Sequence, residues 1–239
     1  MLHLVANYPN PTEYSNSLRT ILEFNPEYLE IQLPFSNPMA DGPTIYNANQ
    51  VARVFDENLE QVLEKAKSKK GNSETKLILM SYLTPLSIIE PEYLVELLVQ
   101  NNFSGAIIPD LAFGSPEQLE LSRLFANNNL YLIPVIASNS TTDRLEFIRS
   151  QLQPQQPIYV MARFGKTGTQ SDLNQELCEY LARIQTIFDT QKICVGFGIS
   201  SSQQVKELQN HNYTPVIGSA IVKSIENNQL QNFLNQIIL

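Results

Sequence analysis

The sequence predicts an α/β fold in which eight parallel strands close into a barrel inside a ring of eight helices, with residues 1–239 forming a single domain. Short runs rich in Ile, Val and Leu alternate with segments of helical spacing along the whole chain, which is typical of βαβ units and a parallel sheet. No linker or shift in composition divides the chain. Eight such units fit a closed barrel better than an open doubly wound sheet, which usually has about five to seven strands.

The elements follow one another in strict alternation. Apolar runs predict strands at residues 3–6, 28–33, 76–82, 105–109, 130–136, 158–163, 193–197 and 215–218. Helical spacing predicts helices at residues 14–24, 47–67, 92–100, 116–127, 142–152, 173–188, 202–210 and 219–237. The fourth helix start is supported by Ser115, a good cap, followed by Pro116 at the first helical position. One face of the last helix carries Leu230, Phe233, Leu234, Ile237 and Ile238, and it would cover the barrel wall beside the first helix.

Composition and charge exclude several classes of function. The chain carries 24 acidic and 16 basic residues and a net charge of −8, which disfavours the basic surface that a nucleic-acid-binding protein needs. Its two cysteines, Cys178 and Cys194, are too few for a metal framework or a disulfide scaffold, so no metal site is expected. We find no signal peptide, and no apolar run approaches the roughly 18–20 residues that cross a bilayer. We therefore expect a soluble, cytoplasmic protein.

Two polar side chains interrupt the apolar second strand. In residues 28–33, Glu30 and Gln32 share one face, and Leu29, Ile31 and Leu33 share the other. The outer face of a barrel strand packs under helices, so we expect the apolar set outside and both polar residues inside the barrel. Burial of a carboxylate costs desolvation free energy unless the group is hydrogen-bonded or has a function. Because desolvation also raises the pKa of a carboxyl group, this position suits Glu30 to proton exchange. The alternative is that Glu30 is a surface charge at a solvated strand end.

A second carboxylate follows the same strand. Asp41 stands in an Asp-Gly-Pro turn within the loop at residues 35–45, at the strand end where barrel active sites lie. Two carboxylates would then share one mouth of the barrel. The commoner role of Asp before Gly is to bond its own backbone, so a simple turn residue is the alternative.

Glycines cluster after the last three predicted strands. Gly165, Gly168, Gly196, Gly198 and Gly218 make up five of the nine glycines in the chain. Loops after strands seven and eight that expose backbone N–H groups at a helix N-terminus form the usual phosphate site of this fold. The clustering favours such a site over simple turns. The polar loop at residues 163–171 would serve either as a lid or as an ordinary surface connection.

Over residues 5–222 the sequence resembles the α subunit of tryptophan synthase, a barrel lyase. The strongest match is LEIQLPFSNPMADGPTI at residues 29–45, which is similar to the family's LELGVPFSDPxADGPxI. GFGIS at residues 196–200 and GSAIV at residues 218–222 match in order and spacing. The resemblance implies a retro-aldol cleavage of indole-3-glycerol phosphate to indole and glyceraldehyde 3-phosphate, without a cofactor, late in tryptophan biosynthesis.

The resemblance also implies roles for individual residues. Glu30 matches the family's general acid and base, and Asp41 matches the carboxylate that stabilises the indole N–H as positive charge develops on the ring. Tyr82 and Tyr159 match tyrosines of the substrate pocket, although both could be ordinary core aromatics. The residues that match the phosphate site are Gly168, Gly198, Gly218 and Ser219.

The implied partner is a β subunit that carries pyridoxal phosphate and receives the indole, in an α2β2 heterotetramer. Pro34, Asn37 and Asp110 match positions near that interface. Asn37 replaces an aspartate that helps to dock the β subunit, and Gln32 stands where the family has glycine. Gln32 is placed to contact the substrate, where its long side chain could crowd the indole pocket. The chain also begins almost at the first strand, so we expect the family's N-terminal helix to be missing.

Three functions follow from these observations. Retention of both Glu30 and Asp41 favours an active lyase. A second possibility is a catalytically weak α-like subunit that mainly binds and activates the β subunit, because of Gln32. The third is another phosphate-binding barrel enzyme; its Schiff-base aldolase version is disfavoured because Lys76 only opens the third strand and no strand carries an interior lysine.

Overall fold

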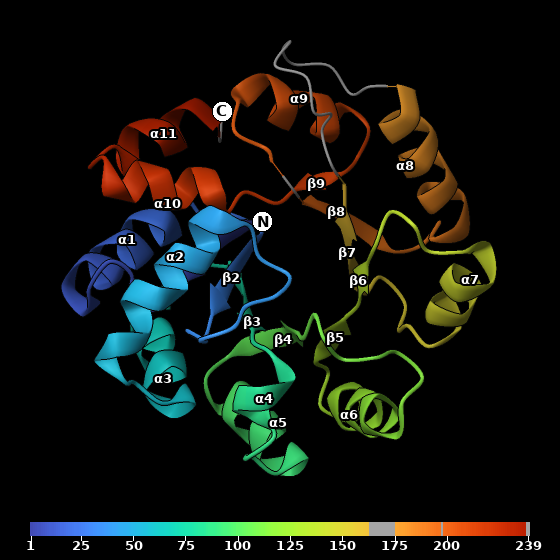
Figure 1. Ribbon diagram of the computed structural model, residues 1–239, viewed down its shortest axis with the longest axis horizontal. Helices are drawn as coiled ribbons and strands as arrows, with labels where there is room; N and C mark the ends of the chain where they lie inside the picture. Colours follow the sequence, from blue (N-terminus) through green and yellow to red (C-terminus); the bar gives the residue numbers. More distant parts are fainter. Residues whose placement is uncertain (163–174, 197, 238–239) are drawn as a thin grey trace.

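The computed structural model describes residues 1–162, 175–196 and 198–237, and its strands stand in a ring inside an outer layer of helices (Figure 1). All strand pairs are parallel, in one sheet of order β1-β2-β3-β4-β5 and a second of order β6-β7-β8-β9. The strands are β1 (Leu2–Val5), β2 (Tyr28–Gln32), β3 (Lys76–Met80), β4 (Phe103–Ile107), β5 (Tyr131–Ile133), β6 (Val135–Ile136), β7 (Pro157–Met161), β8 (Lys192–Gly196) and β9 (Thr214–Pro215).

The two sheets join into a closed ring. β5 and β6 are the halves of the predicted fifth strand, separated at Pro134, which has no N–H to give to a ladder. The Pro134 carbonyl still accepts a hydrogen bond from the Tyr159 N–H at 2.9 Å, so the chain continues along β7. On the other side, Leu2 bridges to Ile217 beyond β9. With β5 and β6 counted as one, the predicted eight-stranded parallel barrel is confirmed in the described part of the chain.

The helices lie outside this ring. They are α1 (Pro11–Glu23), α2 (Pro43–Ala52), η1 (Arg53–Phe55), α3 (Leu59–Lys70), α4 (Leu83–Leu86), α5 (Pro91–Gln100), α6 (Pro116–Asn127), α7 (Thr142–Ser150), α8 (Gln175–Ile187), α9 (Ser202–Asn210), α10 (Ser219–Glu226) and α11 (Leu230–Ile237). The predicted bounds of α6 and α9 are confirmed to the residue. Their caps explain this, since the hydroxyls of Ser115 and Ser201 each accept a backbone N–H of the first turn.

Two predicted helices each divide into two helices, and α4 was not predicted. The helix expected at residues 47–67 divides into α2 and α3, because Asp56 takes a left-handed conformation and Asn58 starts a new helix through a capping box with Gln61. The helix expected at residues 219–237 divides into α10 and α11, with Asn228 left-handed between them. As predicted, α11 contacts α1 beside the barrel wall.

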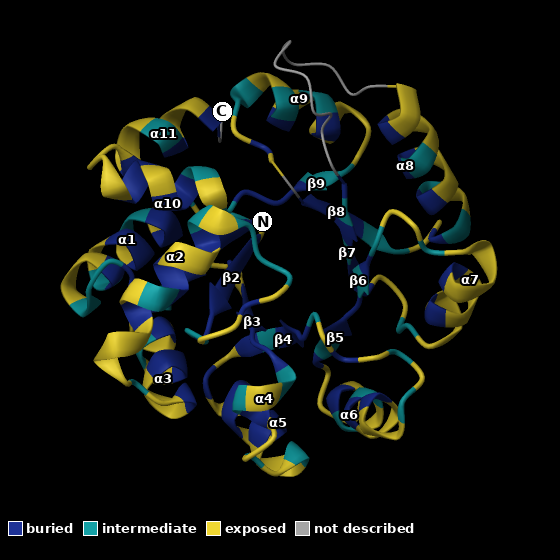
Figure 2. Ribbon diagram, in the orientation of Figure 1, coloured by how far each residue is buried: buried dark blue, intermediate teal, exposed yellow. Residues whose placement is uncertain are grey.

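The apolar core has an outer and an inner part. Leu29, Ile31 and Leu33 belong to the large cluster between strands and helices, and Figure 2 shows buried residues along the strands and the inward faces of the helices. Glu30 and Gln32 therefore face the barrel interior, as the alternation predicts. A second buried cluster includes Tyr28, Ile78 and Cys194. None of the described helices combines the length and apolar character of a membrane span.

Candidate active site

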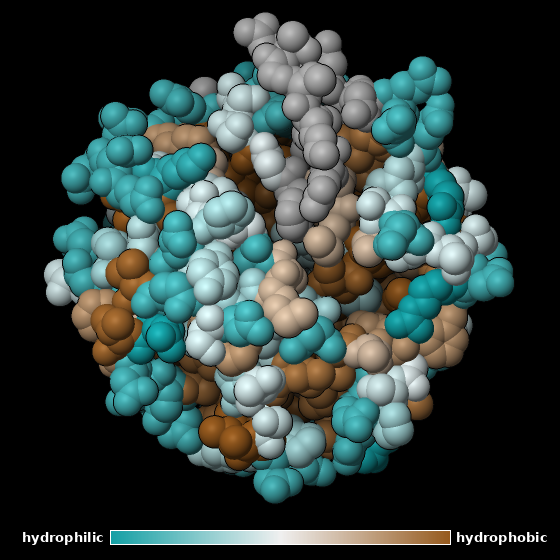
Figure 3. Space-filling view, in the orientation of Figure 1, coloured by the Kyte–Doolittle hydropathy of each residue, from teal (hydrophilic) through white to brown (hydrophobic). Residues whose placement is uncertain are grey.

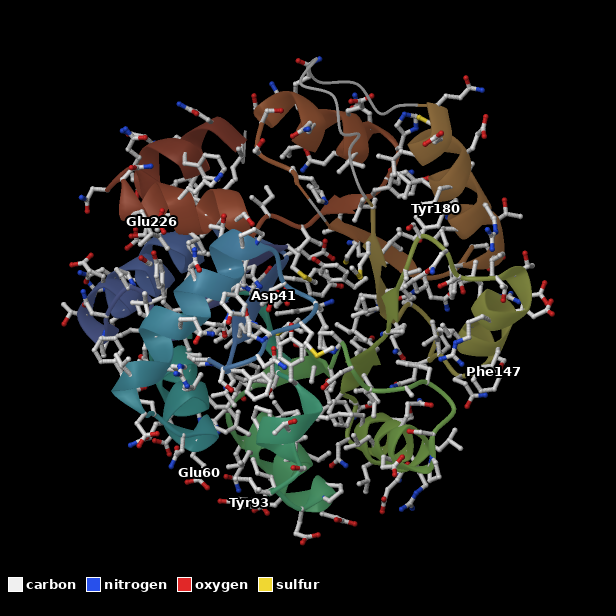
Figure 4. All side chains as sticks on the ribbon, in the orientation of Figure 1. Asp41, Glu60, Tyr93, Phe147, Tyr180 and Glu226 are labelled. Carbon is white, nitrogen blue, oxygen red and sulfur yellow. The ribbon has the colours of Figure 1, made fainter. Side chains whose placement is uncertain are left out.

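A cavity of about 440 Å³ lies where the described strands end, with Glu30 and Asp41 in its wall. Figure 4 places Asp41 near the middle of the ring, whereas Glu226 lies among the outer helices. In Figure 3, hydrophobic side chains are visible between the mostly hydrophilic ones of the rim. Much of the cavity lining is apolar and comes from several strands and from the segments that follow them: Ile45, Met80, Ile107, Val135, Met161, Ile199 and Val216. Such a cavity fits a ligand with an apolar body and a few polar groups.

Glu30 is a buried carboxylate of the barrel interior. Only 3% of the residue is exposed, so the alternative of a solvated surface charge is wrong. Its neighbour across the ladder is His3, whose Nδ1 lies 3.3 Å from Glu30 Oε2. Because Glu30 also lines the cavity, its carboxylate is placed to exchange a proton with a bound molecule.

Asp41 is held by two side chains and shares the cavity with Glu30. Its Oδ2 accepts hydrogen bonds from Gln32 Nε2 at 2.7 Å and from the Tyr82 hydroxyl at 2.9 Å. Burial raises the pKa of the Asp41 carboxyl, although His3, Gln32 and Tyr82 each oppose that shift. The Asp41 N–H also bonds the Pro38 carbonyl at 3.1 Å, so the residue forms a turn while its carboxylate is aimed elsewhere.

Gln32 and Tyr82 serve Asp41 rather than the described cavity wall. Gln32 is fully buried, and its amide points to the Asp41 carboxylate instead of into the open space. The Tyr82 hydroxyl accepts the Ala40 N–H at 3.1 Å, which ties the loop before Asp41 to the end of β3. Gln32 thus gives Asp41 a hydrogen-bond donor that a glycine at this position could not provide.

Tyr159 on β7 lines the cavity, and its ring packs closely against Gly196. A Cβ atom at Gly196 would lie 2.2 Å from the Tyr159 hydroxyl oxygen, so only glycine leaves room for the ring. Burial raises the pKa of the Tyr159 hydroxyl well above its usual range, with the Glu30 and Asp41 charges adding to the effect. Tyr159 is thus a neutral, amphipathic wall of the site at ordinary pH.

Three of the four predicted phosphate residues lie in the described part of the chain, in the segments that follow β8 and β9. Gly198, Gly218 and Ser219 all line the cavity, and Gly198 has a φ of 85° that favours glycine. The Ser200 and Ser201 N–H groups already bond Gln204, at 2.9 and 3.3 Å. Gly218 begins α10 without a side-chain cap, so the first N–H groups of α10 are the ones suited to an anion.

The other predicted positions lie apart from the described cavity wall. Asn37 is exposed and Pro34 is partly exposed in the loop after β2. Asp110 accepts a hydrogen bond from the Leu83 N–H at 2.9 Å, which holds the start of α4. Gly168 and the loop at residues 163–171 fall outside the described residues. Within the described ranges, no group of three or more His, Cys, Asp or Glu side chains could hold a metal ion.

Sequence reasoning missed two charged residues of the site. His3 stands opposite Glu30 in the β1–β2 register, a relation that the sequence of a single strand does not reveal. Lys223, an exposed residue of α10, also lines the cavity. The sequence does indicate Lys223, because this residue follows Ser219 by four positions and so lies on the same helix face. Together, the site offers two carboxylates for proton and charge chemistry, an apolar wall, and a helix N-terminus with a nearby cation.

Comparisons with known proteins show what the whole chain is similar to. Residues 1–237 match the family model described as Tryptophan synthase alpha chain. A tryptophan synthase alpha chain of Desulforapulum autotrophicum is 29% identical over 95% of this chain and 88% of its own length. One from Carboxydothermus hydrogenoformans is 31% identical over 92% of this chain and 80% of its own. The fold is similar to that of a tryptophan synthase alpha-subunit from Pyrococcus furiosus, with a TM-score of 0.86, 23% identity, and coverage of 99% of this chain and 96% of that one.

Proposed function

The chain belongs to the tryptophan synthase alpha chain family, whose reaction is the cleavage of indole-3-glycerol phosphate, and we propose that Glu30 and Asp41 are the catalytic carboxylates of this cleavage. The observation that carries the proposal is the pairing of a buried Glu30 with an anchored Asp41 in one largely apolar cavity. The uncapped N-terminus of α10, together with Lys223, supports a phosphate group bound at the same cavity.

The reaction moves one proton and breaks one carbon–carbon bond. Glu30 gives a proton to C3 of the indole ring, which then carries positive charge. The hydroxyl on the adjoining glycerol carbon returns a proton to Glu30, and its O–H electron pair forms the aldehyde. The electron pair of the broken bond restores the aromatic ring. Indole, which keeps the donated proton at C3, and glyceraldehyde 3-phosphate are released, and Glu30 ends the cycle with the proton taken from the hydroxyl.

Asp41 stabilises the positive charge that develops on the ring through the indole N–H. Its hydrogen bonds to Gln32 and Tyr82 fix the carboxylate before the substrate arrives, so little reorganisation is needed in the transition state. Because burial raises the pKa of Asp41, we expect activity to fall as mildly acidic pH protonates this carboxylate. This role supports an active lyase over a weak α-like subunit, since Gln32 assists Asp41.

The proposal extends to partner and setting. We propose a cytoplasmic, single-domain α subunit that binds a β subunit as an α2β2 heterotetramer through the face near Pro34, Asn37 and Asp110. The lyase step itself would need no cofactor, and pyridoxal phosphate would belong to the β subunit. Gly168 would complete the phosphate site.

Indole release from indole-3-glycerol phosphate tests the function directly. The purified chain should release indole slowly, and a β subunit from the same source should raise the rate at least about ten-fold, because docking favours closure of the loops over the site. Colorimetric detection of indole, with a β subunit heated to unfold it as the control, measures this. No indole from the chain alone or from the mixture would contradict the proposed lyase.

Replacing Gln32 separates support of Asp41 from crowding of the pocket. Gln32→Gly and the volume-matched Gln32→Leu should both lower kcat for indole release about ten-fold, because each leaves Asp41 one hydrogen bond short. The acid limb of the pH profile should also move to higher pH, since the Gln32 donor opposes the raised pKa of Asp41. A faster Gln32→Gly enzyme would instead show that the side chain obstructs the substrate.

A further inference from the structure

We propose that His3 is a positioning residue that holds Glu30 in place and stores the proton that Glu30 delivers to the substrate. This deepens the proposed function, because it concerns the proton-transfer carboxylate of the same site. His3 has no role in the motifs that identify the family, and its place follows from the structure alone. The His3–Glu30 pair is defined by His3 Nδ1 and Glu30 Oε2, which are 3.3 Å apart.

The pair is built on rigid elements in the barrel interior. His3 and Glu30 are register partners in the β1–β2 ladder, and their exposed fractions are only 5% and 3%. On the other side of His3, a Cβ placed on Gly218 would lie 3.5 Å from the imidazole, an ordinary packing distance. The ring is therefore confined between β2 and the segment that leads to α10. Side chains fixed by neighbouring strands hold a catalytic group more accurately than loops do.

The charges around His3 favour its protonated form. Burial alone would lower the pKa of the imidazole, but the Glu30 carboxylate raises it above the usual range, with Asp41 and Gln32 acting in the same direction. Those three groups face His3 from β2 and from the loop that follows it. Lys223, on α10, is the further charged group in the described cavity lining. The buried Glu30 carboxylate and the partly buried Asp41 carboxylate share one cavity and favour a compensating cation, which the imidazolium supplies.

The contact leaves Glu30 able to react. At 3.3 Å the pair is longer than the ~2.7–2.9 Å of a tight charge-assisted hydrogen bond. Glu30 Oε2 and His3 Nε2 are both buried without a hydrogen-bond partner. Because no short hydrogen bond holds the Glu30 carboxylate, it can take the proton from His3 Nδ1 and pass it to a substrate carbon. The hydroxyl proton that Glu30 later accepts returns to His3, so the pair ends the cycle with the one proton with which it began.

The proton on the pair sets a pH dependence. When the pH rises through the raised pKa of His3, the pair loses its proton, and Glu30 has none to give to the ring. We therefore expect an alkaline limb in the pH profile of kcat that follows the titration of His3. In a variant without the imidazole, a lone carboxylic acid must hold the proton. The alkaline limb that follows the titration of His3 should then be lost from the pH profile.

NMR titration of the histidines tests the pair without any assay of activity. The chain has only two histidines, His3 and His211, and His211 is exposed. Long-range ¹H–¹⁵N spectra of the full chain, assigned with His211→Gln, should show His3 titrating above pH 6.5. In Glu30→Gln its midpoint should fall by at least about one pH unit while His211 is unchanged. A titration midpoint of His3 at or below pH 6.5, or a midpoint that is the same in Glu30→Gln, would overturn the proposal.

Kinetics of His3→Gln test the role of the pair in the reaction. We expect kcat for indole release to fall at least about ten-fold, KM to change less than about two-fold, and the alkaline limb that follows His3 to be lost from the pH profile. His211→Gln is the matched control and should resemble the unchanged chain. An unaltered pH profile, or an effect on KM alone, would show that His3 only packs against its neighbours. If the unchanged chain releases no indole, the proposed function fails, while the NMR titration still decides whether the pair exists.

Discussion

Glu30→Gln should lower kcat for indole release by about 10²- to 10⁴-fold, which corresponds to roughly 3–5 kcal/mol of barrier. The amide keeps the volume of the carboxylic acid in a site that is almost fully buried, but it cannot give and regain a proton. Substrate binding should change little, because the phosphate and the apolar body of the proposed substrate would contact other parts of the cavity. Indole release at saturating substrate measures the effect.

A matched control separates loss of chemistry from general damage. Glu23 is an exposed carboxylate on α1, so Glu23→Gln makes the same chemical change away from the cavity and should leave kcat unchanged. Circular dichroism should show the same thermal transition, within a few degrees, for the unchanged chain and both variants. A Glu30→Gln enzyme that keeps more than about a tenth of its activity would show that another group moves the proton.

Gly218→Asp should weaken binding of the phosphate group at least about 100-fold while leaving the binding of free indole nearly unchanged. A carboxylate at this position would face the dianion across a few ångströms, where like charges repel by several kcal/mol at an effective dielectric of about 20. It would also compete for the N–H groups at the start of α10. Calorimetric titration with glycerol phosphate and with indole compares the two ligands.

Two further variants at Gly218 separate charge from size. A Cβ here meets the His3 ring at an ordinary 3.5 Å, so Gly218→Ala should retain most of the phosphate affinity. Gly218→Asn has nearly the volume of aspartate without its charge and should lose less affinity than Gly218→Asp. A negative side chain at a helix N-terminus does not destabilise the helix, so the thermal transition should be intact. Equal loss of both ligands in Gly218→Asp would place the phosphate elsewhere.

Much of the fold was predictable because its causes are local. The alternation of apolar and polar residues in β2 predicted that Glu30 and Gln32 face inward, since side chains on a strand alternate with a period of two. The caps at Ser115 and Ser201 settled the starts of α6 and α9. The break between α2 and α3 had a local signal as well, because Asn58 and Gln61 form a capping box. That signal was masked by continuous helical spacing across the break.

The remaining features of the site depend on relations between distant segments. The sequence by itself determined the barrel, the inward Glu30, the loop that carries Asp41 and the glycines at the strand ends. Tertiary structure decided that Gln32 bonds Asp41 and that His3 stands beside Glu30. Strand register and the return path of a loop fix these contacts, and both arise only when the strands pair and the ring closes. A side chain's spacing in the sequence tells which way it points, but only the closed barrel determines which charge it meets.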